Sequence, residues 1–145
     1  MMAENVPHIL DFCPLEDEKF TRIHTFFDNL KEGKLTTTKC QKCNTLLWQP
    51  RVVCPHCSSD EMEWVELPTT GKLFAFTAML LGAPLGFEDE VPFPIGVVEL
   101  DQVGLKILAR IDDASYEDLE FEMPMEMNVV TLEDGRVLYR FKPKH

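Results

Sequence analysis

The sequence has few basic residues and no long apolar run. It contains 14 Lys and Arg residues against 25 Asp and Glu residues, which gives a net charge of −11. A protein that follows a nucleic-acid backbone needs many bases to neutralise the phosphates, so this balance argues against nucleic acid as a partner. No apolar run approaches the roughly 18 residues of a membrane-spanning helix, so we expect no membrane partner.

The sequence also lacks the motifs of common self-sufficient enzymes. It contains no G-x-S-x-G, no P-loop and no G-x-G-x-x-G. Its four histidines show no spacing typical of a catalytic triad or a metal site; they are His8, His24, His56 and His145. Acyl transfer requires an activated nucleophile with a base within reach. We therefore assign no catalytic residue and expect a chain that is not catalytic on its own.

The first residues, MMAENVPHILDF, lack the basic and the long apolar regions of a secretory signal. We therefore expect a cytoplasmic protein whose cysteines do not form the disulfides of a secreted domain. Cys13 is the one cysteine outside the two pairs described next. A helix start beside it would lower the pKa of its thiol, but no histidine is placed to activate it, so an inert thiol is the simpler interpretation.

Two C-x-x-C pairs, ten residues apart, determine the chemistry of the segment KCQKCNTLLWQPRVVCPHCS. The first pair is Cys40 and Cys43, and the second is Cys54 and Cys57. A tight C-x-x-C turn directs both thiolates at one ion, and two such turns form a tetrahedral Cys₄ shell. Because four cysteines leave no position for water, we predict a structural rather than a catalytic zinc site.

Other interpretations of the cysteines are weaker. A thioredoxin-type redox centre needs one C-x-x-C at a strand-to-helix junction, whereas here two pairs flank an apolar hairpin. Iron in a rubredoxin-like site stays open, because thiolates accept both metals, and it would make the protein red. Zinc is the favoured metal for an ordinary cytosol.

The charge is unevenly distributed along the chain. Residues 31–57 carry five bases and one acid, whereas residues 58–145 carry eighteen acids and seven bases. The basic zone around the cysteine pairs can hold a few phosphates but not a polymer. Its candidates for phosphate binding are Lys39, Lys42 and Arg51.

Residues 14–32 carry the start and stop signals of a helix. Pro14 suits the first turn, acids follow it, and Gly33 lies just beyond the end. An apolar stripe recurs along this segment at helical spacing: Phe20, Ile23, Phe27 and Leu30. The stripe can cover the chain's own ribbon or barrel, or it can bind a partner protein, and both interpretations stay open.

The rest of the chain is predicted to form two β units. Short β-rich segments flank both cysteine pairs, which predicts a zinc ribbon over residues 35–67 after a helical segment over residues 1–34. Five further strands are expected, with a short helix at residues 115–120 after the third: residues 71–81, 95–100, 106–111, 127–132 and 136–142. This order is that of a five-stranded OB-fold barrel, over residues 68–145.

Several residues outside the cysteines have a predicted role. Asn44 and Ser58 follow the two cysteine turns, where left-handed backbone is common. Trp48 is expected to pack against the ribbon, with ligand stacking as the alternative. The loop over residues 82–94 is rich in Gly and Pro yet apolar, which favours a binding role. Its candidates for contact with a ligand or a partner are Phe87, Phe93 and Pro94.

Together these features resemble the DUF35 family of zinc-ribbon OB-fold proteins. The resemblance covers nearly the whole chain and rests on KCQKCNTLLWQPRVVCPHC, SSDEMEWVEL, GKLFAFT, VPFPIGVVELD and LEDGRVLYRFKP. Ser58 replaces a frequent glycine, and the loop over residues 87–94 departs from the family pattern. The implied fold is mostly β with an N-terminal helix, a rubredoxin-like Cys₄ zinc ribbon and then a five-stranded OB-fold barrel.

The resemblance implies an accessory role in acyl-CoA metabolism. Proteins like this are non-catalytic subunits or appended domains beside thiolases, hydroxymethylglutaryl-CoA synthases, aldolases and hydratases, where they help assemble the complex and line the coenzyme A site. We therefore expect a subunit that scaffolds a thiolase-like enzyme, with structural zinc as cofactor and coenzyme A or acyl-CoA as ligand. The alternative is a single-stranded nucleic-acid-binding module, which the acidic barrel disfavours.

Overall fold

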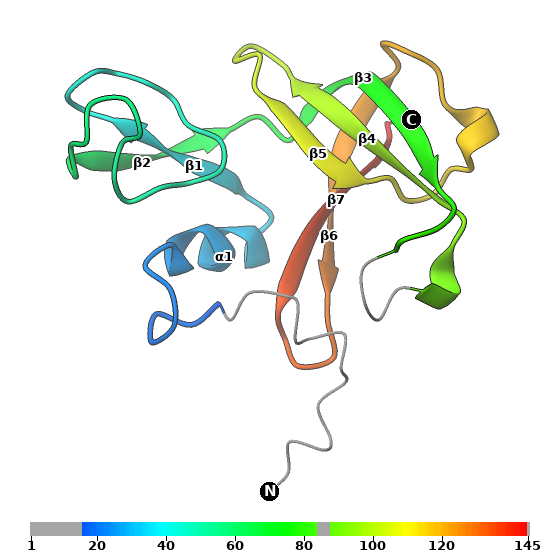
Figure 1. Cartoon of the computed structure of the whole chain (residues 1–145), viewed down its shortest axis with the longest axis horizontal. Coiled ribbons are helices and arrows are strands. Elements are labelled where there is room, and N and C mark those ends of the chain that lie inside the picture. Colours follow the sequence, from blue (N-terminus) through cyan, green and yellow to red (C-terminus); the bar gives the residue numbers. More distant parts are fainter. Residues whose placement is uncertain (1–15, 84–87, 145) are drawn as a thin grey trace, which may run out of the picture.

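The structure, a computed structural model, describes residues 16–83 and 88–144. A short helix, a two-stranded sheet and a five-stranded sheet follow one another along this part of the chain (Figure 1). The helix is α1 (His24–Lys31), and the first sheet pairs β1 (Leu35–Cys40) with β2 (Met62–Leu67). The second sheet contains β3 (Thr70–Met79), β4 (Phe93–Leu100), β5 (Lys106–Arg110), β6 (Pro124–Thr131) and β7 (Val137–Pro143).

The five strands form a nearly closed antiparallel barrel in the order β5-β4-β3-β6-β7. A parallel bridge between Ile111 and Phe141 joins the two ends of this order. The short 3₁₀ helix η4 (Tyr116–Asp118) lies between β5 and β6, as in the OB-fold order. The predicted fold class, a mostly β chain with one helix, a ribbon and an OB-fold barrel, is confirmed.

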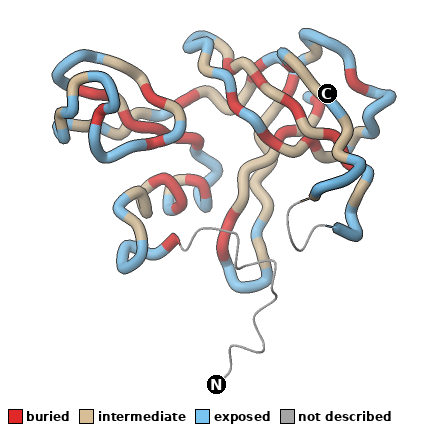
Figure 2. The backbone as a smooth tube through the Cα atoms, in the orientation of Figure 1, coloured by how far each residue is buried: buried red, intermediate tan, exposed pale blue. Residues whose placement is uncertain are grey.

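Alternation along β4 and β5 places one set of residues in the barrel core and the other on its outer face. Val98 and Ile107 are fully buried, whereas Leu108 is 63% exposed. Figure 2 shows buried stretches along the strands of the barrel. Gly96 lies on the inner face, where an added Cβ would come within 2.9 Å of Leu73 Cδ1. The outer face of these strands carries apolar residues as well, and this face contributes to the groove described below.

The helix is shorter than the sequence predicts. The prediction of a helix over residues 14–32 is wrong for residues 16–23, which form turns before α1, and its expected start at Pro14 lies outside the described residues. Side chains compete with the helix here: Asp17 Oδ1 accepts from the Lys19 N–H at 2.9 Å, and Thr21 Oγ1 accepts from the Ile23 N–H at 3.2 Å.

A contact distant in sequence also holds the start of this segment. Both carboxylate oxygens of Glu16 lie 3.1 Å from the Val137 nitrogen of β7. Glu16 is only 6% exposed, so this end of the segment is held against the barrel. The turns therefore follow from tertiary structure that the local pattern does not contain.

The apolar stripe of the helical segment divides into two parts. Phe27 and Leu30 are buried in the core that also contains Leu35 of the ribbon and Phe141 of the barrel. Phe20 is 65% exposed and Ile23 is half-buried. Phe27 and Leu30 therefore cover the chain's own ribbon and barrel, and Ile23 packs against the same core while half-buried. None of the helices that the structure describes is long and apolar enough to cross a membrane.

Candidate metal centre and ligand groove

Two backbone turns of the same shape hold the cysteine pairs. The Asn44 N–H donates to the Cys40 carbonyl at 2.8 Å, and the Ser58 N–H donates to the Cys54 carbonyl at 2.9 Å. Asn44 has φ 61° and Ser58 has φ 63°, so the predicted left-handed turns are confirmed. The Cys43 N–H lies 3.4 Å from Cys40 Sγ, as expected where an amide stabilises a thiolate.

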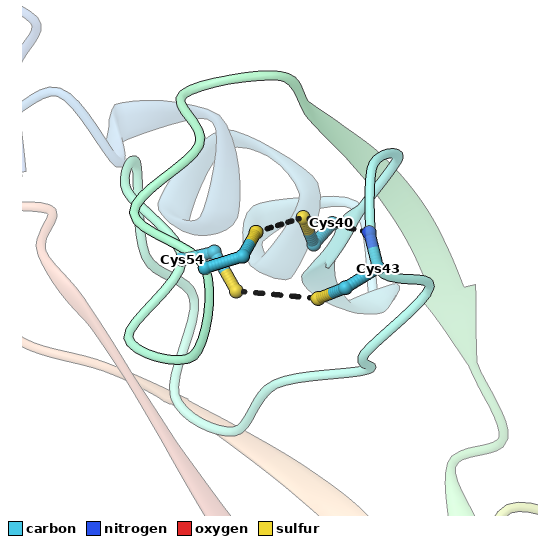
Figure 3. A group of neighbouring side chains, drawn as sticks. Cys40, Cys43 and Cys54 are labelled. Carbon is cyan, nitrogen blue, oxygen red and sulfur yellow. Dashed lines mark hydrogen bonds between the residues drawn. The ribbon is translucent and has the colours of Figure 1, made fainter.

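The four sulfurs converge on one point. Cys40 Sγ lies 3.5 Å from Cys57 Sγ, Cys43 Sγ lies 3.6 Å from Cys54 Sγ, and all four atoms lie within 4.8 Å of one another (Figure 3). Four sulfurs bound to zinc at about 2.3 Å would be separated by about 3.8 Å, so the spacing fits a tetrahedral ion. A shell of four thiolates leaves no open position, so the ion that it holds is structural.

The thiols also have the electrostatics of a cation site. Hydrogen bonds with Thr45 lower the pKa of the Cys43 thiol to about 6. A backbone hydrogen bond from Ser59 lowers the pKa of Cys57, but burial and neighbouring sulfurs such as Cys40 outweigh it and raise this pKa to about 12. Thiolates this close repel one another, and a divalent cation removes that repulsion.

Threonines of β1 fix the segment between the two cysteine pairs. The Thr37 hydroxyl donates to the Leu47 carbonyl. Thr38 Oγ1 donates to the Arg51 carbonyl and accepts from the Arg51 N–H, both at 2.8 Å. These bonds hold residues 47–51 against β1, and Trp48 within this segment is thereby directed at the helix and the barrel.

Three aromatic rings join the helix, the ribbon and the barrel. Trp48 lies 5.9 Å from Phe26 of α1 and 5.7 Å from Tyr139 of β7, measured between ring centroids. Phe26 and Tyr139 also meet, at 6.2 Å. Burial raises the pKa of Tyr139, although a hydrogen bond with Gln49 opposes the shift, so its phenol is neutral at physiological pH. The sequence predicts that Trp48 packs against the ribbon. In the structure its ring also contacts the helix and the barrel.

A groove of about 620 Å³ opens beside this aromatic cluster. Helix α1, the ribbon segment over residues 47–51 and the outer faces of the barrel strands all contribute to it. Its volume is that of a small-molecule site, and such sites often lie between domains. Its apolar lining residues include Ile23, Phe26, Phe27, Leu30, Trp48, Pro50, Met79, Phe93, Ile95, Leu108, Ala109, Val137 and Leu138.

Charged residues of the lining gather at Arg110, on the outer face of β5. The Arg110 guanidinium carbon lies 4.0 Å from the centroid of the Phe93 ring. Its Nη1 donates to Glu90 Oε1 at 2.6 Å, from the short 3₁₀ helix η3 (Glu88–Glu90). Arg140 of β7 also lines the groove, and its Nη1 lies 3.3 Å from Asp112 Oδ1. The groove is therefore apolar along its walls and cationic at this place.

The residues predicted to bind a ligand or a partner fall in different places. Phe93 lines the groove, and Pro94 is buried beside it. Arg51 is exposed next to the groove wall, Lys42 is exposed and Lys39 is half-buried on the ribbon, and none of the three lines the groove. Phe87 and Cys13 lie outside the described residues.

The sequence analysis missed Arg110, Arg140 and Tyr139. Each lies in a barrel strand, where alternation predicts an outward or inward side chain but not what faces it. Their proximity depends on strand pairing and on the position of α1, which one sequence does not reveal. The one local signal was an arginine that follows the apolar residues 107–109 of its strand.

Two family profiles match the zinc ribbon and the OB-fold barrel separately. Residues 27–63 match the family profile described as ChsH2, rubredoxin-like zinc ribbon domain, and residues 64–130 match ChsH2, C-terminal OB-fold domain. The zinc-ribbon match, together with the four converging sulfurs, identifies the metal centre as a structural zinc site.

Relatives include a DUF35 domain-containing scaffold protein of Pyrococcus furiosus, 32% identical over 113 residues that cover 75% of this chain and 81% of that protein. The benzoylsuccinyl-CoA thiolase subunit BbsA of Thauera aromatica is 28% identical, with 72% of each chain covered. A solved structure titled Ltp2-ChsH2(DUF35) aldolase superposes with a TM-score of 0.71 at 25% identity, covering 86% of this chain and 96% of that one. On these matches the chain belongs to the DUF35 family.

Proposed function

We propose that this chain is an accessory subunit that scaffolds an acyl-CoA-processing enzyme of the thiolase type and contributes a wall of its substrate site. The named relatives support an acyl-CoA enzyme as the partner, because they include a scaffold protein, a thiolase subunit and an aldolase complex. The thiolase type is the more specific part of the proposal and draws on the Thauera aromatica relative.

The observation that carries the proposal is the combination of a closed metal centre with an open groove. The four thiolates occupy every position of a tetrahedral ion, so this ion does not activate a substrate. The groove, in contrast, is large enough for a ligand and is mainly apolar. Such a chain is suited to holding a substrate or a partner, while the partner supplies the reacting groups.

Coenzyme A is the proposed ligand of the assembled complex. Its apolar acyl end suits the groove beside Phe93, whereas Pro94, the next residue of β4, is buried and does not line the groove. Its phosphates suit the basic ribbon, where Arg51 lies next to the groove-lining Pro50. Lys39 and Lys42 are further phosphate candidates on the ribbon surface.

Titration calorimetry with coenzyme A tests the proposal. The zinc-loaded chain is titrated alone and after co-expression and co-purification with a thiolase-type catalytic subunit. We expect the two chains to purify together and the complex to bind coenzyme A, with weaker binding when Arg51→Gln is introduced. Failure of the chains to co-purify, or turnover of a thioester by this chain alone, would refute the proposed division of roles.

A further inference from the structure

The cationic part of the groove has a geometry that suits one chemical group. Arg110 is held on two sides, by the Phe93 ring beneath its guanidinium and by its place on β5 opposite Ile95 of β4. Among the residues that the structure describes, its buried Nε has no hydrogen-bond partner and lies 4.0 Å from Asp112 Oδ1. The guanidinium is therefore positioned by its surroundings while part of its hydrogen-bonding capacity is unused.

The two acids near Arg110 differ in how firmly they are held. Asp112 accepts from Asn128 Nδ2 at 2.8 Å and pairs with Arg140 at 3.3 Å, and its side chain is only 16% exposed. Glu90 lies on the short helix η3, its side chain is 43% exposed, and it forms an ion pair with Arg110. Asp112 is thus a fixed counter-ion, whereas Glu90 can turn into water at little cost.

We propose that the groove binds an acyl chain that ends in a free carboxylate, with the carboxylate taking the place of Glu90 on Arg110. The Glu90 oxygen, 2.6 Å from Nη1, marks where a ligand oxygen would lie. Arginine binds a carboxylate with its planar donors, and the two terminal nitrogens Nη1 and Nη2 form the edge on which a carboxylate at the place of Glu90 would lie, while the buried Nε faces Asp112. The apolar walls at Ile95 and Leu108 then hold the rest of the chain.

Charge balance favours a carboxylate over other anions. Arg110 and Arg140 face Glu90 and Asp112, so a monoanion that replaces Glu90 leaves the local charge unchanged. A phosphate dianion would place an extra negative charge beside the nearly buried Asp112, which is unfavourable at low exposure. A neutral chain end would leave Glu90 in place and gain only apolar contacts.

This inference rests on the proposal that the groove holds the acyl part of a substrate, but it is tested on the isolated zinc-loaded chain. Decanoate, decanol and decyl phosphate share one apolar chain and differ in their end group. Binding is measured by calorimetry at concentrations below micelle formation, with tryptophan fluorescence of a Trp64→Phe protein as a second readout, because Trp48 lines the groove and Trp64 does not. A hydrogen-bonded charge pair corresponds to about tenfold or more in affinity, so we expect decanoate to bind about tenfold tighter than decanol.

Two variants and one matched control identify the residues responsible. Arg110→Gln should abolish the preference for decanoate while decanol still binds, and Glu90→Gln should tighten decanoate binding by removing its competitor. Lys106→Gln changes another outward base of β5, whose Nζ lies over Phe74 instead, and should leave the preference unchanged. Because Glu90 is partly exposed, its variant is expected to fold even if Arg110→Gln does not.

The other outcomes overturn the inference. Equal affinity for decanoate and decanol, no binding of either, or an unchanged preference in the Arg110 and Glu90 variants would each do so. Tighter binding of decyl phosphate than of decanoate would contradict the assignment of a carboxylate. Each of these results leaves co-purification with a thiolase-type subunit untouched, so failure of this inference is distinct from failure of the proposed function.

Discussion

The ribbon and the barrel are stabilised in different ways. The ribbon has only two strands, and its structure depends on four converging thiolates and on threonine bonds to the segment between the cysteine pairs. The barrel has five strands around a core that includes Leu73, Val98, Ile107 and Phe141, all 0% exposed. A unit as small as the ribbon buries too little apolar surface to fold alone, so its metal supplies the missing stability.

The groove belongs to neither unit alone. Trp48 and Pro50 come from the ribbon, Phe26 from the helix, and Leu108 and Tyr139 from the barrel. Loss of either unit therefore removes part of the binding surface. The zinc site is therefore required for binding without touching the ligand, because it positions one wall of the groove.

The largest expected effect comes from loss of the metal, which should disrupt the ribbon but not the barrel. Cys54→Ser removes a buried ligand, and structural zinc in small peptides contributes about 10–16 kcal/mol at pH 7. We expect loss of zinc, loss of the native fluorescence of the two ribbon tryptophans, Trp48 and Trp64, and loss of ligand binding, while the barrel stays folded. Metal analysis, fluorescence and circular dichroism measure these three effects.

The matched control for the metal variant is Ser58→Gly. Ser58 has φ 63°, a conformation that glycine adopts without strain, so this change should retain zinc and slightly raise stability. Full zinc content in Cys54→Ser would contradict the assignment of this cysteine as a ligand. Iron in place of zinc in the wild-type protein would contradict the metal's identity.

A substitution in the barrel core tests whether the ribbon keeps its zinc when the barrel is destabilised. Phe141→Ala empties a fully buried position and should lower the free energy of unfolding by about 3–5 kcal/mol. Phe20→Ala, at a position 65% exposed, should change it by less than about 0.5 kcal/mol. Denaturant unfolding and zinc content are measured for both. Loss of zinc from folded Phe141→Ala would show that the two units are not independently stabilised.

A smaller effect is expected from the threonine that holds the ribbon segment. Thr38→Val leaves the N–H and the carbonyl of Arg51 without the side-chain partner that both have in the wild type. Such a loss costs about 1–3 kcal/mol, and it should weaken groove binding while zinc is retained. Thr77→Val, at an exposed position of β3, is the control. Unchanged stability and binding would show that Thr38 does not position the groove wall.

The smallest predicted effect is a pH dependence at Glu16. Burial raises the pKa of this carboxyl, against the hydrogen bond from the Val137 N–H and the charges of Lys31 and Arg136; Asp134 adds to the rise. A raised pKa in the folded state means that the stability contribution is full below about pH 4.5 and is lost as the pH rises through the raised pKa. Relative to Glu16→Gln, the wild-type protein should therefore lose stability as the pH rises from about 4.5 through the raised pKa. Parallel melting curves for the two proteins, or an opposite trend, would contradict this.

Structural features with a local cause follow from the sequence, whereas features that depend on contacts distant in the chain do not. The turns at Asn44 and Ser58 and the convergence of the cysteines follow from short-range spacing, and the strand order predicts the barrel. The late start of the helix does not, because Glu16 is held by Val137, 121 residues away. The groove was likewise missed, since Arg110 meets Glu90 only through the folded barrel.

Affinity purification of the full chain from its native cell extract, followed by mass spectrometry, tests the central claim most directly. The account predicts that a thiolase-type acyl-CoA enzyme subunit purifies with the zinc-loaded chain in stoichiometric amount, and that Cys54→Ser captures less of it. Recovery of the chain without any acyl-CoA enzyme subunit would contradict the account.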